Sequence, residues 1–347
     1  MYIFVPVTTP SKTDVSLNDI KAALQRSGYL IESRIDAVLR KRGYYVESNV
    51  SHVDPVTGKP REIDLSALQA FRAGKRTEDF VWSLCLIECV NSPQPIALFT
   101  RPDAIPFMRR ELIYIAGVPV RLLTGSNKWT AVPEAIETEK YHHYCRGRIA
   151  TQFCSFTAKK ANPPELFAQH VPDHFNSFSK LLDAIRESSN EVADCWFDAG
   201  DARYEHLNIQ FMYPIVVVTG APLFDVIQHR DQLDVRERPH FLYRASGILN
   251  QQVVEYLVDV VTEEAFPRLI SVIDREMKTI ARQFQDRSKT VRKSLTEIYH
   301  RAKRIHSVAE MRNLTQWPLP RSFEQAKTLG GWNSPDPSGS QPPKFKS

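Results

Sequence analysis

The feature that most restricts the fold is the apolar run FVWSLCLIEC, residues 80–89, which is interrupted near its end by Glu88. A short, nearly continuous apolar run is typical of a strand that is buried on both faces in the middle of a sheet. A carboxylate is costly to place at the end of such a strand unless it has a partner or a ligand. The run therefore predicts a central strand and points to a polar site where that strand ends.

In the segments around this run, apolar residues recur with the spacing of a helix in some places and of a strand in others. Apolar residues recur at helical spacing over residues 16–42, with Gly28 as a point where the helix divides in two. Residues 44–53 and 62–68 read as two strands that form a hairpin. The predicted order is helix (16–42), strand (44–53), strand (62–68), strand (80–89), helix (108–117) and strand (118–124).

The chain of 347 residues is long enough for one large domain or two. Residues 1–125 are expected to form a core of their own. Residues 126–312 are expected to be an α/β extension of it or a second small domain, with a helix over 177–189, a strand over 208–220 and basic helices at the end. Residues 313–347 are rich in Pro, Gly and Ser, which predicts a disordered tail.

Three acids fall on consecutive elements of the predicted core. Glu32 lies on the first helix, Asp64 on the second strand and Glu88 on the third. Adjacent strands that each present an acid at the same height offer hard oxygen ligands, which suit Mg²⁺ or Mn²⁺. Asp64 and Glu88 are the expected metal ligands, with the carbonyl of Cys89 as a third, and Glu32 is expected nearby.

Each acid taken alone has a structural explanation. Glu88 could be a strand-end acid paired with Arg101 or Arg109, and Asp64 could pair with Arg61. The helix acid could be solvated. The combination of the three, on elements in this order, favours a site over three separate ion pairs.

The same residues resemble the PD-(D/E)XK nuclease superfamily. The resemblance rests on Glu32, on TGKPREIDLSA (57–67) and on LIECVNSPQPIALF (86–99). It implies an α/β fold with a restriction-endonuclease-like core, a central mixed sheet flanked by helices. It implies metal-dependent hydrolysis of DNA in defence or repair, in a prokaryotic cytoplasm, with Asp64 and Glu88 as the two acids of the motif.

The sequence departs from the motif at position 90, where the superfamily has a lysine and this chain has Val90. That lysine positions and activates water, and losing such a group commonly costs about 10²–10⁴ in rate. Three interpretations follow. The lysine has moved to another element, with Lys59, Arg61 or Lys21 as candidates; the protein is a weak nuclease; or it is an inactive nuclease-fold module that binds nucleic acid or a protein partner.

The remaining features restrict partners and location. The formal net charge of +5 is compatible with nucleic acid as a partner, and the basic stretch 278–304 is either a solvated helix face or a phosphate-binding one. The sequence has no transmembrane run, no membrane partner is expected, and five cysteines without framework spacing favour a cytoplasmic protein with reduced thiols. A protein partner or a homo-oligomer stays open. The run YHHYC (141–145) raises zinc as a lesser possibility, since no spaced second ligand pair accompanies it.

Overall fold

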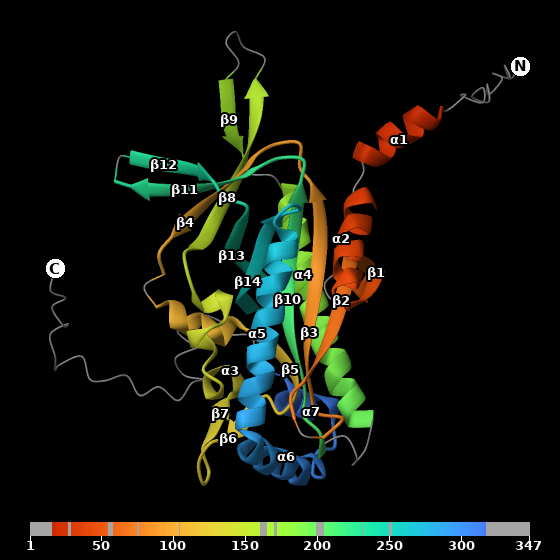
Figure 1. The fold of residues 1–347 in the computed structure, drawn as a ribbon, viewed down its shortest axis with the longest axis vertical. Coiled ribbons are helices and arrows are strands. Elements are labelled where there is room, and N and C mark those ends of the chain that lie inside the picture. Colours follow the sequence, from red (N-terminus) through yellow and green to blue (C-terminus); the bar gives the residue numbers. More distant parts are fainter. Residues whose placement is uncertain are drawn as a thin grey trace, which may run out of the picture.

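The computed structural model describes residues 16–26, 29–54, 58–74, 76–103, 105–159, 165–169, 172–198, 205–230, 232–249 and 252–316. These residues form an α/β fold in which a large mixed sheet is flanked by helices (Figure 1). This confirms the α/β class and the mixed sheet flanked by helices that were expected from the sequence. Of the tail predicted over 313–347, residues 317–347 lie outside the described residues. Residues 313–315 belong to the last helix, and Thr315 is buried.

The described elements alternate between long strands and a few long helices. The helices are α1 (Leu17–Arg26), α2 (Tyr29–Lys41), η1 (Pro106–Leu112), α3 (Val132–Ala135), η2 (Thr138–Lys140), η3 (His143–Cys145), α4 (Pro172–Asp198), α5 (Phe266–Asp286), α6 (Ser288–Ala302) and α7 (Val308–Thr315). The strands are β1 (Tyr45–Val53), β2 (Pro60–Arg72), β3 (Phe80–Asn91), β4 (Ile96–Arg101), β5 (Tyr114–Val118), β6 (Arg121–Leu123), β7 (Trp129–Ala131), β8 (Ile149–Lys159), β9 (Glu165–Gln169), β10 (Asn208–Thr219), β11 (Leu223–His229), β12 (Gln232–Glu237), β13 (His240–Leu249) and β14 (Gln252–Thr262).

The main sheet has the strand order β1-β2-β3-β10-β14-β13-β8-β4-β11-β12, with β5 added to β10 and β9 to β8. The β1–β2–β3 unit is antiparallel, as predicted for the hairpin. Strand β10 then runs parallel to β3 and pairs with it from Phe80 and Asn208 to Asn91 and Thr219. Strand β3 is therefore central, as its apolar composition predicts.

Two apolar layers lie against the two faces of this sheet. On one face, α2 and α5 cover alternate residues of β3 such as Cys85 and Ile87. On the other face, α4 covers Leu84 and Leu86. Figure 1 shows α2 and α5 on one side of β3 and β10 and α4 on the other. Glu88 has the same parity as Leu84 and Leu86, so its side chain is directed to the α4 face.

The helix and the strand that complete the core differ from those predicted. Residues 106–112 form the short 3₁₀ helix η1, residues 114–118 form strand β5, and residues 121–123 pair with β7 in a separate small sheet. The prediction of a helix over 108–117 was wrong because Tyr114–Val118 is an apolar run that is buried on every residue, as in a central strand. In place of the predicted helix and strand, α4 and β10 lie against β3.

The sheet also crosses the boundary predicted at residue 125. Because β10 inserts between β3 and β14, residues on both sides of position 125 contribute to one sheet. Strands from residues 126–312 thus belong to the same sheet as those of the first segment. Segment 92–171 separates β3 from α4 and holds β4 and β8, which join the far side of the sheet.

Candidate active site

The two strand acids meet where the pairing of β2 with β3 ends. The last paired residues are Leu65 and Ile87, so Asp64 and Glu88 follow at the same height on neighbouring strands. Beyond this point the amide of Cys89 donates a hydrogen bond of 2.6 Å to Oδ2 of Asp64. The N–H and C=O of one residue in an extended strand point to the same side, so the carbonyl of Cys89 also faces Asp64.

Glu88 is nearly buried, with 3% of its surface exposed, and its partner comes from α4. Nζ of Lys180 lies 3.1 and 3.3 Å from the two carboxylate oxygens of Glu88. The hydroxyl of Ser177, one helical turn earlier on α4, also hydrogen-bonds to this carboxylate. Helix α4 therefore supplies both a cation and a hydrogen-bond donor to the end of β3.

The electrostatic effect of burial dominates this site. Burial and then the charge of Asp64 raise the pKa of Glu88, Lys180 and Ser177 lower it, and the net result is a pKa of about 7. Burial likewise raises the pKa of Asp64, against the Cys89 amide and Lys180. For Glu32, burial and then the charge of Asp64 raise the pKa, and Lys180 lowers it. The three acids thus share one electrostatic environment with a single nearby ammonium group.

The structure decides between the partners weighed for each acid. Arg109 pairs with Asp103, and Arg61 pairs with Asp54 at 2.7 Å. Glu88 forms its ion pair with Lys180. The suggested pairs of Glu88 with Arg109 and of Asp64 with Arg61 are therefore replaced by other ion pairs in the described chain.

Sequence reasoning missed Lys180. Of the cations considered for the missing motif lysine, Arg61 pairs with Asp54, and Lys59 and Lys21 are exposed. Lys180 stands 92 residues after Glu88 and lies beside Leu181 and Leu182, at the border of the apolar face of a predicted helix. That position was the available signal, but nothing local indicated which strand the helix would cover.

Val90 lies two residues beyond Glu88 and packs against the same apolar layer under α4. Strand side chains alternate between faces, so positions 88 and 90 point the same way. The ammonium group that approaches Glu88 comes from the helix that covers this face. A lysine at position 90 would therefore lie on the same face of the sheet as the ammonium group of Lys180.

A second charged cluster lies in the core on the α5 face. Both ring nitrogens of His143 contact carboxylates: Nδ1 lies 2.8 Å from Glu276, and Nε2 lies 3.1 and 3.2 Å from the oxygens of Asp259. The backbone amide of His143 also donates to Glu276 at 2.6 Å, and His240 lies 2.7 Å from Asp259. The two carboxylates raise the pKa of His143 to about 10 despite its burial, which opposes the shift.

This cluster contains the residues of the YHHYC run. His142, His143 and Glu276 are the one group of His, Cys, Asp or Glu residues in the described chain whose ligand atoms all lie within 4.8 Å of one another. The ring nitrogens of His143 are engaged by carboxylates at hydrogen-bond distance, which is the geometry of a buried ion network. The carboxylate oxygens of Glu32, Asp64 and Glu88 do not form such a group in the described chain.

Comparisons with protein-family models, with curated proteins and with solved structures gave no match to this chain. Within the described residues, no helix is long and apolar enough to cross a membrane. All five cysteines are free thiols.

Proposed function

We propose that this protein hydrolyses phosphodiester bonds of DNA in a metal-dependent reaction at Asp64, Glu88 and Lys180. The observation that carries the proposal is the approach of the Lys180 ammonium to within 3.1 Å of Glu88, at the point where Asp64 and Glu88 end paired strands. Two acids and a lysine in this relation are the functional groups of the PD-(D/E)XK superfamily, and the lysine here comes from a helix.

The order of elements supports the same proposal. The chain has a helix (α2), an antiparallel unit of three strands (β1–β3), a helix (α4) and a strand (β10) parallel to the third. This is the element order expected of a restriction-endonuclease-like core. In this reading segment 92–171 is an insertion between the third strand and the second helix of that core. The proposal therefore places the core at residues 16–91 and 172–219 rather than at 1–125.

The donor set fits Mg²⁺ or Mn²⁺. Asp64 and Glu88 supply carboxylate oxygens and Cys89 a carbonyl directed to the same side, which are the ligands that hard cations take. Burial raises the pKa of both acids because their negative charges are costly in this environment, and a bound cation would offset that cost. When bound, such an ion lowers the pKa of water and offsets charge on the phosphate.

The residues of the chain have separate tasks in the proposed reaction. Lys180 holds a positive charge beside Glu88, where it orients the attacking water and stabilises charge on the phosphoryl oxygens. Ser177 fixes the carboxylate of Glu88 by a hydrogen bond, and the Cys89 amide fixes that of Asp64. Glu32, on α2, adds a negative charge at the edge of the site and orients a water or a second cation.

Cleavage of plasmid, linear and single-stranded DNA at low salt tests the proposal. We expect wild-type protein to cut in Mg²⁺ or Mn²⁺ and to stop in EDTA, and Asp64→Ala to lose activity by about 10²-fold or more. Glu62→Ala is the matched control, because Glu62 is an exposed acid on the same strand. Cleavage that survives in Asp64→Ala, or that persists in EDTA, would sink the assignment.

Metal binding is expected to depend on pH through Glu88. Because its pKa is about 7, a proton competes with the metal, and the carboxylate is mostly free only above that pH. The apparent affinity for Mn²⁺ should rise about tenfold between about pH 6 and about pH 8. Calorimetric titration measures this, and Glu62→Gln should keep the dependence while Glu88→Gln removes it. An affinity that is flat over this range contradicts a Glu88 ligand.

A second candidate function is a non-catalytic nuclease-fold module that binds nucleic acid or a protein partner. The observation in its favour is the direct ion pair of Lys180 with Glu88, which neutralises the buried acid without a metal, together with Val90 in place of the motif lysine. This function predicts DNA binding that weakens steeply with salt and no cleavage by the wild-type protein. The cleavage assay separates the two.

A further inference from the structure

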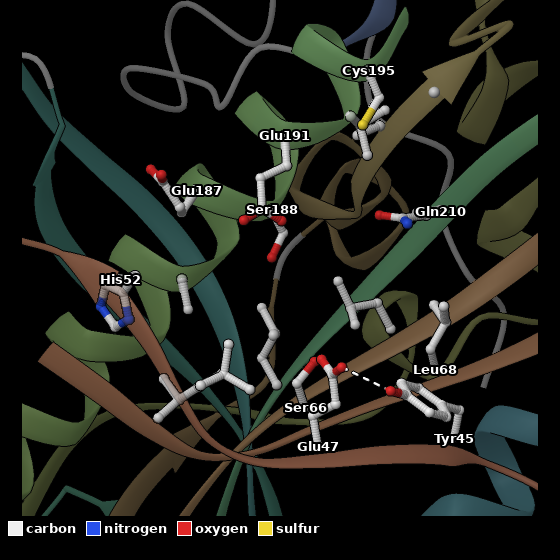
Figure 2. Close-up of a pocket in the computed structure, with 18 of the residues that line it drawn as sticks. Tyr45, Glu47, His52, Ser66, Leu68, Glu187, Ser188, Glu191, Cys195 and Gln210 are labelled. Atoms are coloured by element: carbon white, nitrogen blue, oxygen red, sulfur yellow. Dashed lines mark hydrogen bonds between the residues drawn. The ribbon is translucent and has the colours of Figure 1, made fainter.

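A cavity of about 620 Å³ lies between α4 and the sheet, away from the residues of the candidate active site. Figure 2 shows Glu187, Ser188, Glu191 and Cys195 on one side of it, all from α4. Strands β1, β2, β3, β5 and β10 form the other side. This volume is in the range of small-molecule sites.

The charged residues that line this cavity are mainly acidic. Four glutamates line it, Glu47, Glu78, Glu187 and Glu191, and none of the described lining residues is lysine or arginine. Burial raises the pKa of Glu191, and the charges of Glu187, Glu47 and Asp194 raise it further. Glu47 accepts a hydrogen bond from the hydroxyl of Tyr45 at 2.9 Å, which leaves its charge in place (Figure 2). Apart from the histidines, of which His206 lies 3.9 Å from Glu78, no described lining residue can carry a positive charge, so acidic groups are in excess on the walls.

Buried polar atoms with few or no partners accompany the acids. His52 lines the cavity with 7% of its surface exposed, and in the described structure its ring nitrogens have no side-chain partner and approach only the backbone of Val50. The amide oxygen Oε1 of Gln210, also a lining residue, is buried without a partner. Unsatisfied buried polar atoms are rare because each carries a desolvation cost, so they indicate a missing ligand or water.

The floor of the cavity is apolar. Side chains of β2 and β3 contribute most of it, with one further residue from β5 and one from α4; they are Ile63, Leu68, Leu84, Leu86, Ala116 and Val192. A ligand for this cavity therefore combines an aliphatic body with cationic, hydrogen-bond-donating ends. Alkyl chains with terminal ammonium groups have this form, since their methylenes cover apolar surface while the charged ends stay with polar partners.

We propose that this cavity binds an aliphatic diamine or polyamine, with its ammonium groups held by Glu47, Glu187 and Glu191 and its methylene chain lying on the apolar floor. Acceptors on Gln210 and on His52 complete the contacts. Burial lowers the pKa of His52, so its ring is neutral near pH 7 and one nitrogen is free to accept an N–H from the ligand.

Equilibrium binding of 1,8-diaminooctane tests the chemistry directly, with spermidine as a second amine and 1,8-octanediol as the uncharged analogue of equal length. We expect both amines to bind the wild-type protein and the diol to bind at least about tenfold more weakly. The double variant Glu187→Gln/Glu191→Gln should weaken diamine binding by at least about tenfold. Glu237→Gln, an exposed acid on β12, should leave it unchanged.

Cys195 gives an independent readout of the location. Its side chain lines the cavity and is exposed, whereas Cys85 and Cys145 are buried. Diaminooctane should slow alkylation of Cys195 by iodoacetamide, and the diol should not. Equal binding of diamine and diol, unchanged affinity in the double glutamine variant, or alkylation that the diamine does not slow would each overturn the proposal.

The outcome is separable from that of the proposed function. The binding and alkylation measurements are repeated on full-length protein in the Asp64→Ala background, where the candidate active site is disabled, and no readout involves DNA. A failure of amine binding leaves the nuclease proposal standing. A failure of DNA cleavage leaves the cavity proposal standing.

Discussion

Lys180→Met is expected to lower the rate of metal-dependent DNA cleavage by about 10²–10⁴, because it removes the one ammonium group that contacts Glu88. Methionine keeps much of the length and the apolar stem of lysine, so the packing of α4 beside Leu181 and Leu182 should persist. Without the ammonium, the pKa of Glu88 rises further, since Lys180 lowers it. The rate constant under saturating Mg²⁺ measures the loss, with DNA affinity followed separately.

Restoring the lysine on the strand is the sharper test of the same idea. Positions 88 and 90 point to the α4 face, so Val90→Lys in the Lys180→Met background should recover a substantial part of the activity. Lys21→Met is the control, because Lys21 is an exposed lysine on α1. Full activity of Lys180→Met would show that another group does this work. Loss of activity without rescue, together with unfolding of the variant, would point to a purely structural ion pair.

His143→Gln is expected to destabilise the fold by about 3–5 kcal/mol, the typical result of removing one partner from a buried ion network. Asp259 is fully buried and Glu276 nearly so, and each loses the cation that holds its pKa low. Chemical denaturation at about pH 6 measures the free energy of unfolding. His300→Gln, an exposed histidine on α6, should change it by less than about 0.5 kcal/mol.

The same substitution should change how stability varies with pH. The folded pKa of His143 is raised from 6.5 to about 10, so its contribution is fully present below about pH 6.5 and is lost as the pH rises through about 10. The carboxylates have lowered pKa values, so their contribution is present above about pH 4.5 and is lost on acidification. Wild-type stability should thus fall between about pH 6.5 and about 10, and His143→Gln should flatten that fall. A slope that is equal in both proteins contradicts a charged His143.

The sequence predicts those elements whose hydrophobic periodicity is clear and whose pairing strands are close in sequence. The antiparallel unit β1–β3 and the long strand β10 follow from alternation and from apolar runs. The helix predicted over 108–117 failed because Tyr114–Val118 satisfies both a helical spacing and an apolar strand, and only its pairing with β10 decides between them. Burial of a whole run is a tertiary property that periodicity does not report.

The candidate site likewise contains residues that the sequence could place and residues that it could not. Asp64 and Glu88 lie one strand apart in the sequence and in space, so their proximity could be predicted from a hairpin register. Lys180 could not be placed, because a helix that begins 80 residues beyond β3 carries no local mark of the strand it covers. The network around His143 was equally hidden: its acids, Asp259 and Glu276, come from elements more than 100 residues away along the chain.

The separation of β3 from β10 along the chain has a consequence for its synthesis on the ribosome. Strand β3 emerges with β2 beside it, but its other edge waits for β10, which pairs with it along its whole length. At about 5–20 residues per second, residues 92–219, which run from the end of β3 to the end of β10, take about 6–25 s to be made. During that interval the nascent chain presents an apolar, unpaired strand edge, the kind of surface that chaperones bind and that aggregates form on. Folding of this protein in the cell is therefore expected to depend on protection of β3 until translation is well past residue 219.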